Sequence, residues 1–267
     1  MVLGKLEASN IIELVLFLVV LALIMEIVDS SLGMMYGTLL SPILVGCGFE
    51  PLLVVPAILI SQAIGGIGGT ISHQKFKNAN FNGLTRDTKI TLAMVIPGLV
   101  VVLLGVFIAV RLPKLWVETY IGALVVVMSV LCLSPIRYKF AWWKHYGVGI
   151  LAAFNKALTG GGFGPVTSTG GIIGGLESKV SIATTTCAEV FICIAAFVAY
   201  IVFYGSVDVV FVCSLCIGAI VGGLIGPYIS SRVSHKRLRF IIGVLGIIAG
   251  VGLLFRVIKI EIGSYLY

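Results

Sequence analysis

Charged residues are scarce in this 267-residue sequence: Asp, Glu, Lys and Arg together make up 11% of the chain. Hydrophobic residues make up 59%, and the mean hydropathy is +1.16. A soluble domain of this length cannot hide so much apolar surface from water, so the composition excludes a soluble fold. It predicts an all-α integral membrane protein, because helices satisfy their own backbone hydrogen bonds in lipid.

Several motifs that carry covalent chemistry are missing as well. There is no G-x-x-x-x-G-K-[ST] loop, which ATP-driven pumps use to hold phosphates. The zinc motif H-E-x-x-H and the nucleophile elbow G-x-S-x-G are also absent, and the histidines are only His73, His145 and His235. An intramembrane enzyme therefore has little support, and we expect no cofactor and no metal site.

Long apolar stretches are abundant. A helix needs roughly 20 apolar residues to cross a bilayer, and clear examples are residues 11–30, 51–72, 88–110, 117–134, 179–204, 208–227 and 240–257. No small-residue cleavage site follows the first stretch, so we expect it to be retained as a span. The whole chain, residues 1–267, is expected to form a single transmembrane domain.

The two halves of the sequence resemble each other when the chain is shifted by 127 positions. The matching pairs are Gly33 with Gly160, Gly37 with Gly164, Ser41 with Ser168, Gly48 with Gly175 and Glu50 with Glu177. In the same register Asp29 falls on Lys156. We therefore expect two structural repeats, one over about residues 11–134 and the other over about residues 142–257.

Each repeat contains a short Gly-rich segment, at residues 31–48 and 159–175. Gly and Pro interrupt both segments, so their helices must be broken. Irregular backbone at membrane depth survives only where it is buried in protein or lines a watery cavity. The expected bundle has eight full spans plus these two short segments, which either cross fully or re-enter.

Basic residues favour full crossing. Each repeat then has an odd number of passes, so the two repeats are inverted relative to each other. Three basic loops would share one side of the membrane, as the positive-inside tendency requires. Their residues are Lys75, Lys77, Arg86 and Lys89; Arg137, Lys139 and Lys144; and Arg232, Lys236, Arg237 and Arg239. Arg256 and Lys259 are exceptions, because they fall on the other side.

Lys156 is the sharpest candidate for substrate binding, since a charge within a span costs at least ~2.5 kcal/mol and needs a reason to be there. Its ammonium, the Thr159 hydroxyl and the N–H groups at the start of a half-helix could converge on an anion. Alternatively, Lys156 extends to the membrane interface or pairs with Asp29. The predicted substrate-binding residues are Lys156, Asn155, Thr159, Gly160, Gly161, Gly162, Gly37, Thr38, Ser41, Ser168 and Thr169.

A second group of residues is predicted to couple transport to protons or other ions. Glu26 and Asp29 could carry protons, or they could be structural counter-charges to Lys156. Glu189 lies in mid-span, and the equivalent position of the first repeat holds Gln62. A buried acid where the other repeat has an amide suggests a group that titrates during transport, although it could instead hydrogen-bond a neighbouring helix.

Motifs in both halves carry a family resemblance. They are Gly48-Phe49-Glu50-Pro51, Ser61-Gln62 and His73 in the first half, and Gly160-Gly161-Gly162-Phe163-Gly164-Pro165, Gly175-Leu176-Glu177, Ala183-Thr184-Thr185-Thr186 and Gly205-Ser206-Val207-Asp208 in the second. Over nearly its whole length the sequence resembles the sulfite exporter family, TauE/SafE-like membrane permeases. The resemblance implies transport of sulfite or sulfonates, including sulfoacetate, across the cytoplasmic membrane of a prokaryote.

The leading hypothesis is therefore a secondary transporter that holds an anion near the midplane and works by alternating access, with proton coupling as one option. The alternatives are a passive anion channel and a transporter of a non-sulfur anion such as a carboxylate or nitrite. The expected partners are a small anionic substrate and membrane lipids, because the net charge of +7 lies in membrane-flanking loops and does not indicate nucleic acid. Formation of a homodimer is left open.

Overall fold

The computed structural model describes residues 8–134, 142–173, 176–230, 240, 244 and 247–259, and all regular structure in these residues is helical. The helices are α1 (Ala8–Leu32), α2 (Tyr36–Gly46), α3 (Pro51–Lys75), α4 (Arg86–Ala109), α5 (Lys114–Leu133), α6 (Trp142–Thr159), α7 (Phe163–Ile173), α8 (Ser178–Tyr204) and α9 (Val209–Ser230). Residues 247–259 form a further helical stretch. Arg137, Lys139 and the predicted basic loop at 232–239 lie outside the described residues.

Five of the described helices, α1, α3, α4, α8 and α9, are long and apolar enough to cross a membrane. With 20 and 18 residues, α5 and α6 are close to the roughly 20 that a crossing needs. The prediction of a helical membrane protein is confirmed.

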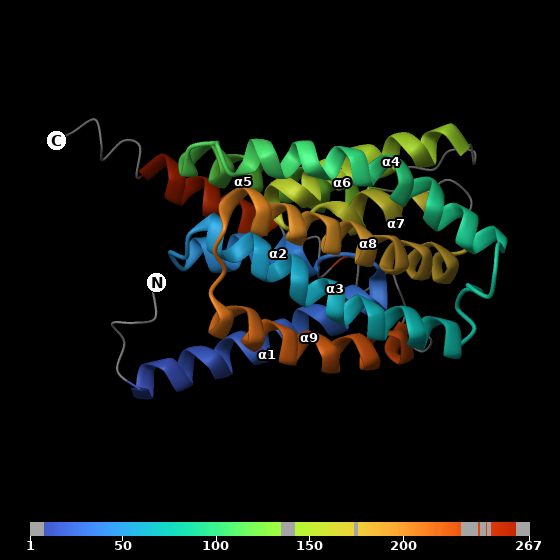
Figure 1. Ribbon diagram of the computed structural model, residues 1–267, viewed down its shortest axis with the longest axis horizontal. Coiled ribbons are helices and arrows are strands. Elements are labelled where there is room, and N and C mark those ends of the chain that lie inside the picture. Colours follow the sequence, from blue (N-terminus) through green and yellow to red (C-terminus); the bar gives the residue numbers. More distant parts are fainter. Residues whose placement is uncertain are drawn as a thin grey trace.

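The helices form layers in which α3 and α8 lie between two outer pairs (Figure 1). On one side α1 packs along α9, and on the other α4 packs along α6. The central helices connect these pairs, because α3 packs against α9 and α8 packs against α4. The short helices α2 and α7 therefore occupy the interior, where irregular backbone is shielded from lipid.

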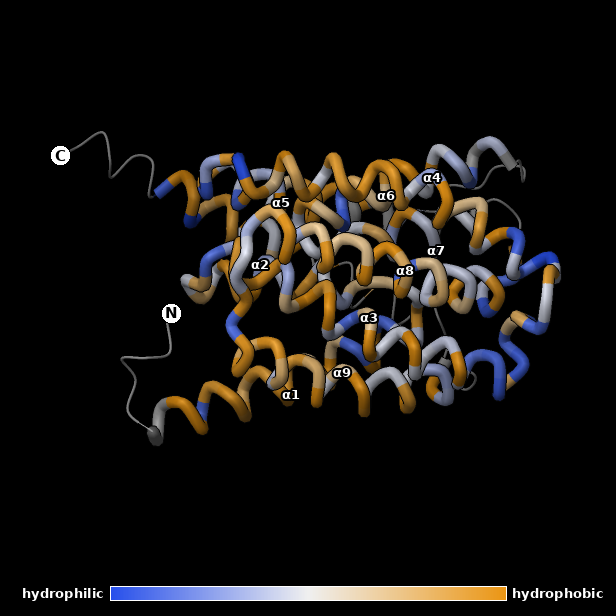
Figure 2. The backbone as a smooth tube through the Cα atoms, viewed as in Figure 1, coloured by the Kyte–Doolittle hydropathy of each residue, from blue (hydrophilic) through white to orange (hydrophobic). Residues whose placement is uncertain are grey.

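Large apolar side chains cover the outside of the bundle. Leu103 on α4 is 49% exposed and Val202 on α8 is 71% exposed, and Figure 2 shows hydrophobic residues along the helices with hydrophilic ones gathered toward the bundle ends. An apolar surface of this extent is unusual for a soluble monomer and suits a surface that faces lipid chains.

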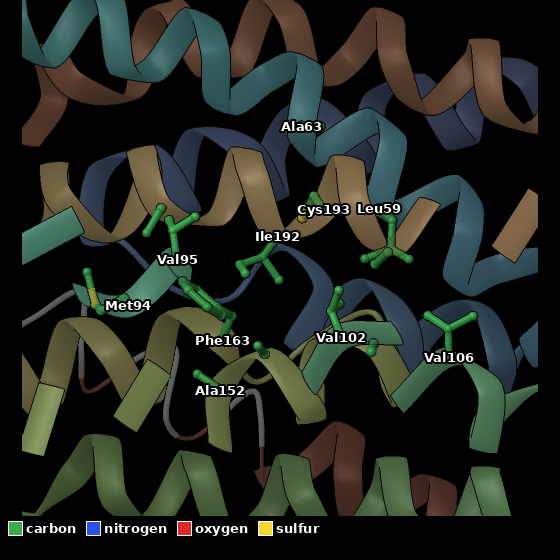
Figure 3. Close-up of a cluster of buried hydrophobic side chains, with 14 of the residues drawn as sticks. Leu59, Ala63, Met94, Val95, Val102, Val106, Ala152, Phe163, Ile192 and Cys193 are labelled. Carbon is green, nitrogen blue, oxygen red and sulfur yellow. The ribbon is translucent and has the colours of Figure 1, made fainter. Parts of the chain in front are cut away.

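A hydrophobic cluster formed by residues of both halves is closely packed around Phe163, the first residue of α7. Its ring is fully buried, and Figure 3 shows it beside Ile192 of α8 and above Ala152 of α6. Val102 and Val106 of α4 belong to the same cluster. This packing fixes the start of α7 against three long helices.

Both short Gly-rich segments are interrupted, as the sequence predicts. Gly33 and Met35 have positive φ between α1 and α2, and Gly160 and Gly162 have positive φ between α6 and α7. Each short helix has 11 residues and is therefore about 16 Å long, roughly half of the hydrocarbon thickness. Both interruptions consequently lie well inside the bundle.

The two interruptions cross each other with backbone against backbone. A Cβ atom at Gly37 would lie 1.7 Å from the carbonyl oxygen of Gly160, and one at Gly164 would lie 2.5 Å from that of Gly33. Neither position leaves room for a side chain, because the neighbouring atoms are main-chain atoms that cannot rotate away. Glycine is thus required here by close approach.

Arg256, an exception to the charge distribution, has a structural role. Its guanidinium donates a hydrogen bond to the carbonyl oxygen of Val45, in the last turn of α2. The last carbonyl groups of a helix lack partners within the helix and carry partial negative charge, which a cation satisfies. Arg256 thereby stabilises the C-terminal end of α2.

We predict that Gly37→Ala lowers the melting temperature of the detergent-solubilised protein by at least about 5 °C, because the new methyl group forces the two interruptions apart. Gly46→Ala is the matched control, since Gly46 lies on the same helix and a Cβ there would meet nothing within 4 Å. Equal melting temperatures for the two variants would contradict the close crossing.

Candidate functional site

A chain of four polar side chains lies next to the crossing, one from each of α1, α3, α6 and α8. Gln62 Nε2 donates to Asp29 Oδ2 at 3.2 Å, and Lys156 Nζ donates to Gln62 Oε1. Lys156 Nζ also lies 2.9 Å from Glu189 Oε1. Lys156 is 0% exposed and Glu189 is 4% exposed, so this ion pair is inside the protein.

The helix interruptions determine where these charges lie. Lys156 is in the last turn of α6, where the partial negative charge of the helix end favours a cation. Asp29 is near the end of α1, but its Oδ1 accepts a hydrogen bond of 2.8 Å from the backbone N–H of Tyr36, the first residue of α2. The Asp29 side chain therefore satisfies an N–H group at the start of a half-helix.

Glu26 lies one turn before Asp29 on α1 and is fully buried. Its Oε1 accepts a hydrogen bond of 2.8 Å from Ser30 Oγ, while its Oε2 has no hydrogen-bond partner within the described residues. Glu189 Oε2 also lacks such a partner there. Each of these carboxyl groups thus keeps one oxygen available, for a proton or for a water molecule.

Three buried carboxyl groups consequently share one buried ammonium. Within the described part of the chain, Lys156 is the only buried lysine or arginine. If Glu26, Asp29, Glu189 and Lys156 were all ionised, the cluster would carry two net negative charges, which is very unfavourable in a region closed to water. Neutrality of the cluster therefore requires protons on two of the three carboxyl groups.

The other residues predicted to bind substrate surround Lys156 in an extensive hydrogen-bond network. Thr159 Oγ1 accepts from the Gly161 N–H at 3.0 Å, and Thr38 Oγ1 accepts from the Gly162 N–H at 2.9 Å. Asn155 Oδ1 accepts from the Tyr120 hydroxyl at 2.5 Å. The N–H groups that the sequence analysis assigns to an anion are thus occupied by protein hydroxyls in this conformation.

Ser41 and Ser168, which occupy equivalent positions in the two halves, differ in their contacts. Ser41 is 1% exposed, and its hydroxyl has no partner within the described residues. Ser168 donates to the carbonyl oxygen of Gly164 at 2.6 Å. Thr169 belongs to α7, but its side chain lies outside the described residues. The buried hydroxyl of Ser41 is therefore available to a ligand.

Sequence reasoning missed three buried or partly buried tyrosines. The Tyr36 hydroxyl lies 2.8 Å from Ser61 Oγ, and the Tyr200 hydroxyl donates to the carbonyl oxygen of Ala157 at 3.0 Å. Tyr120, as noted, donates to Asn155. A tyrosine in mid-span, whose hydroxyl must find a partner in the absence of water, is the sequence signal that could have identified them.

Two cavities lie at the end of the bundle that carries the α8–α9 loop. The larger, of about 390 Å³, is lined by residues that include Glu50, Tyr204 and Asp208. The smaller, of about 40 Å³, also touches Glu50 and extends to Tyr200. Tyr200, which lines the smaller cavity, donates to the carbonyl oxygen of Ala157, the residue after Lys156.

No group of three or more His, Cys, Asp and Glu side chains that could hold a metal ion occurs among the described residues. The polar cluster combines one buried ammonium, which can attract an anion, with carboxyl groups, which can bind protons.

Comparison with known proteins decides the family, because residues 18–253 match the family model "Sulfite exporter TauE/SafE". The chain belongs to the sulfite exporter TauE/SafE family. Two relatives from Bacillus subtilis (strain 168) are each described as a probable membrane transporter protein. YtnM is 26% identical over 239 residues, covering 84% of this chain and 77% of the relative. YjnA is 26% identical over 235 residues, covering 82% of this chain and 91% of the relative.

No solved structure matches the chain. The family and the relatives identify the protein as a multi-pass membrane transporter, and the resemblance noted in the sequence is confirmed.

We predict that Lys156→Met lowers the melting temperature by about 10 °C, because removal of one partner leaves a buried carboxylate without its ammonium. The double variant Lys156→Met with Glu189→Gln should recover at least half of this loss, since both charges of the pair are then removed. Lys179→Met on the exposed start of α8 is the control for loss of a lysine. Additive losses in the double variant would show that the pair is not coupled.

Proposed function

We propose that the protein is a secondary transporter that moves small sulfur-containing anions, of the sulfite, sulfonate and sulfoacetate class, across the cell membrane by alternating access with proton coupling. The observation that carries the proposal is the fully buried Lys156 beside the crossing of the two helix interruptions. A buried cation in a membrane transporter marks the substrate pathway by default, because its presence there costs free energy that only a function repays.

The donors around Lys156 support an oxyanion as the substrate. Sulfite and sulfonate groups each present three oxygens, which lose their hydration when they enter a closed site. The ammonium of Lys156, the hydroxyls of Thr38 and Thr159 and the amide groups of Gly161 and Gly162 could replace that hydration after a small rearrangement. The choice of sulfur as the central atom rests on the family description.

The helix boundaries support two structural repeats, which we propose to be inverted relative to each other. They recur at an interval of 127 residues: α1 and α6 end at Leu32 and Thr159, α2 and α7 begin at Tyr36 and Phe163, and α3 and α8 begin at Pro51 and Ser178. The packing also recurs, because α1 lies along α9 as α6 lies along α4. Alternating access then follows from an exchange of conformations between two similar halves around a fixed site.

We predict that a sulfur anion at 100 times its Kd stabilises the parent protein by about 2.7 kcal/mol, since it binds only the folded state. Sulfite, sulfoacetate and thiosulfate should be compared with a carboxylate in a thermal-shift assay. Lys156→Gln should abolish the shift, whereas Lys179→Gln, at an exposed position, should retain it. A full shift with Lys156→Gln would contradict the proposed site, and a shift with the carboxylate alone would favour a non-sulfur substrate.

Transport in proteoliposomes separates a carrier from a passive anion channel. A carrier that alternates saturates with substrate and shows counterflow of labelled against unlabelled anion. Flux that rises in proportion to concentration and ignores a proton gradient would favour the channel.

We predict opposite membrane sidedness for two equivalent loops, α3–α4 in the first repeat and α8–α9 in the second, which lie at opposite ends of the bundle (Figure 1). In a background without native cysteines, Asn82→Cys should react only from the cytoplasmic side, where the basic residues belong. Ser206→Cys should react only from the outside with the same membrane-impermeant maleimide. Labelling of both positions from one side would rule out inverted repeats.

A further inference from the structure

Glu189 occupies the place on Lys156 that a substrate anion needs. Its Oε1 lies 2.9 Å from Lys156 Nζ, and both side chains are buried. Another of the ammonium's three donors bonds to Gln62 Oε1. The charge of the ammonium is already compensated by Glu189, so an incoming anion meets a carboxylate that repels it, whereas Gln62 is neutral.

We propose that Glu189 and the substrate anion compete for Lys156, and that each monovalent anion is therefore carried together with one proton in the same direction. This inference rests on the proposed function, and it adds the mechanism and the stoichiometry of coupling.

The charges around Glu189 fix the proton count. The groups that face it are Lys156 on α6, Gln62 on α3, Asp29 and Glu26 on α1 and the Cys193 thiol on α8. Three carboxyl groups and one ammonium are neutral when two protons are bound. When a monovalent anion joins the ammonium, neutrality requires a third proton, whichever carboxyl group receives it. Glu189 is the carboxylate that then lies next to the anion. The third proton, which is taken up from the aqueous solution together with the anion, therefore binds to Glu189.

The same exchange explains how an empty transporter can return. With no anion bound, Glu189 compensates the charge of the Lys156 ammonium. The empty site can therefore switch from facing one side of the membrane to facing the other without an unpaired charge. With anion and proton bound, Lys156 is paired with the anion and Glu189 is neutral. Both states that cross are compensated, while the state with an anion but no extra proton is not. Net flux is thereby linked to protons.

The experiment uses purified parent protein in proteoliposomes with labelled methanesulfonate, a monovalent anion whose charge does not change between about pH 5 and 8. With the outside one pH unit more acidic than the inside, one proton per anion should produce about tenfold accumulation. A membrane potential set with potassium and valinomycin should not change this ratio, because the carried charges cancel. A ratio near a hundredfold, or one that follows the potential, would overturn the proposed stoichiometry.

Glu189→Gln separates exchange from net transport. Glutamine is neutral in both states. Asp29 and Glu26 are not paired with Lys156, since Asp29 reaches it through Gln62, and they are expected to keep the two protons that they hold in the parent. Lys156 should then bind methanesulfonate without a further proton, with an affinity that is independent of pH. In the parent, affinity should increase as the pH falls. Exchange of internal for external methanesulfonate should continue in the variant. Proton-driven net uptake should fall by roughly 100-fold, because the empty site would have to reorient with an unpaired ammonium.

Two further variants keep the result interpretable. Glu189→Asp retains the carboxyl group and should restore proton-driven uptake at least in part. Glu177→Gln, an exposed position immediately before α8 with no side-chain capping bond, should behave as the parent. Proton-driven uptake by Glu189→Gln, or loss of exchange in a variant that melts at the parent temperature, would overturn the competition. Absence of exchange in the parent would instead contradict the proposed function for sulfonates.

Discussion

The rest of the structure depends on the contact between two interrupted stretches of backbone in the middle of the bundle. Glycines on both stretches make this contact possible, and at Gly37, Gly161 and Gly164 a single Cβ atom would collide with a main-chain oxygen of the other stretch. If the two helices were unbroken at this depth, they would contact each other only through side chains, because their backbone groups would be bonded within each helix. Because both are broken, helix ends with partial charges and backbone groups that bond to side chains lie at a depth where the membrane itself supplies no hydrogen-bond partner.

The polar cluster is a consequence of those helix ends. Lys156 lies at the end of α6, and Asp29 accepts a hydrogen bond from the first N–H of α2, so each group has a backbone partner before any side-chain contact is counted. Gln62 and Glu189, from the two central helices, then connect these two groups into one chain. The bundle around them isolates this chain from lipid, and α3 and α8 contribute both to the layer contacts and to the site.

Much of this could be predicted from the sequence, for identifiable physical reasons. Composition and span length determine a helical membrane protein, and the positions of Gly33 and Gly160 predict where the chain breaks, because glycine occurs where backbones must approach or adopt positive φ. The identity of the ion-pair partner could not be predicted. The register of the repeats places Lys156 opposite Asp29, but the structure pairs it with Glu189 and reaches Asp29 through Gln62. Pair choice depends on side-chain reach across helices, which the register does not contain.

The two halves of the cluster are related by position but not by charge. The bond between Gln62 and Asp29 in the first half corresponds to the ion pair between Glu189 and Lys156 in the second. Had both halves kept an acid at the position of Asp29, two carboxylates would face each other with no cation to hold an anion. Had both kept a lysine, the empty site would contain two ammonium groups. The actual site has Asp29 in one half and Lys156 in the other, and it has the amide of Gln62 in one half and the acid Glu189 in the other. Such a site is compensated when it is empty and still presents a cation to a ligand. The divergence of the repeats at these positions, rather than their similarity, is therefore what makes the crossing chemically useful.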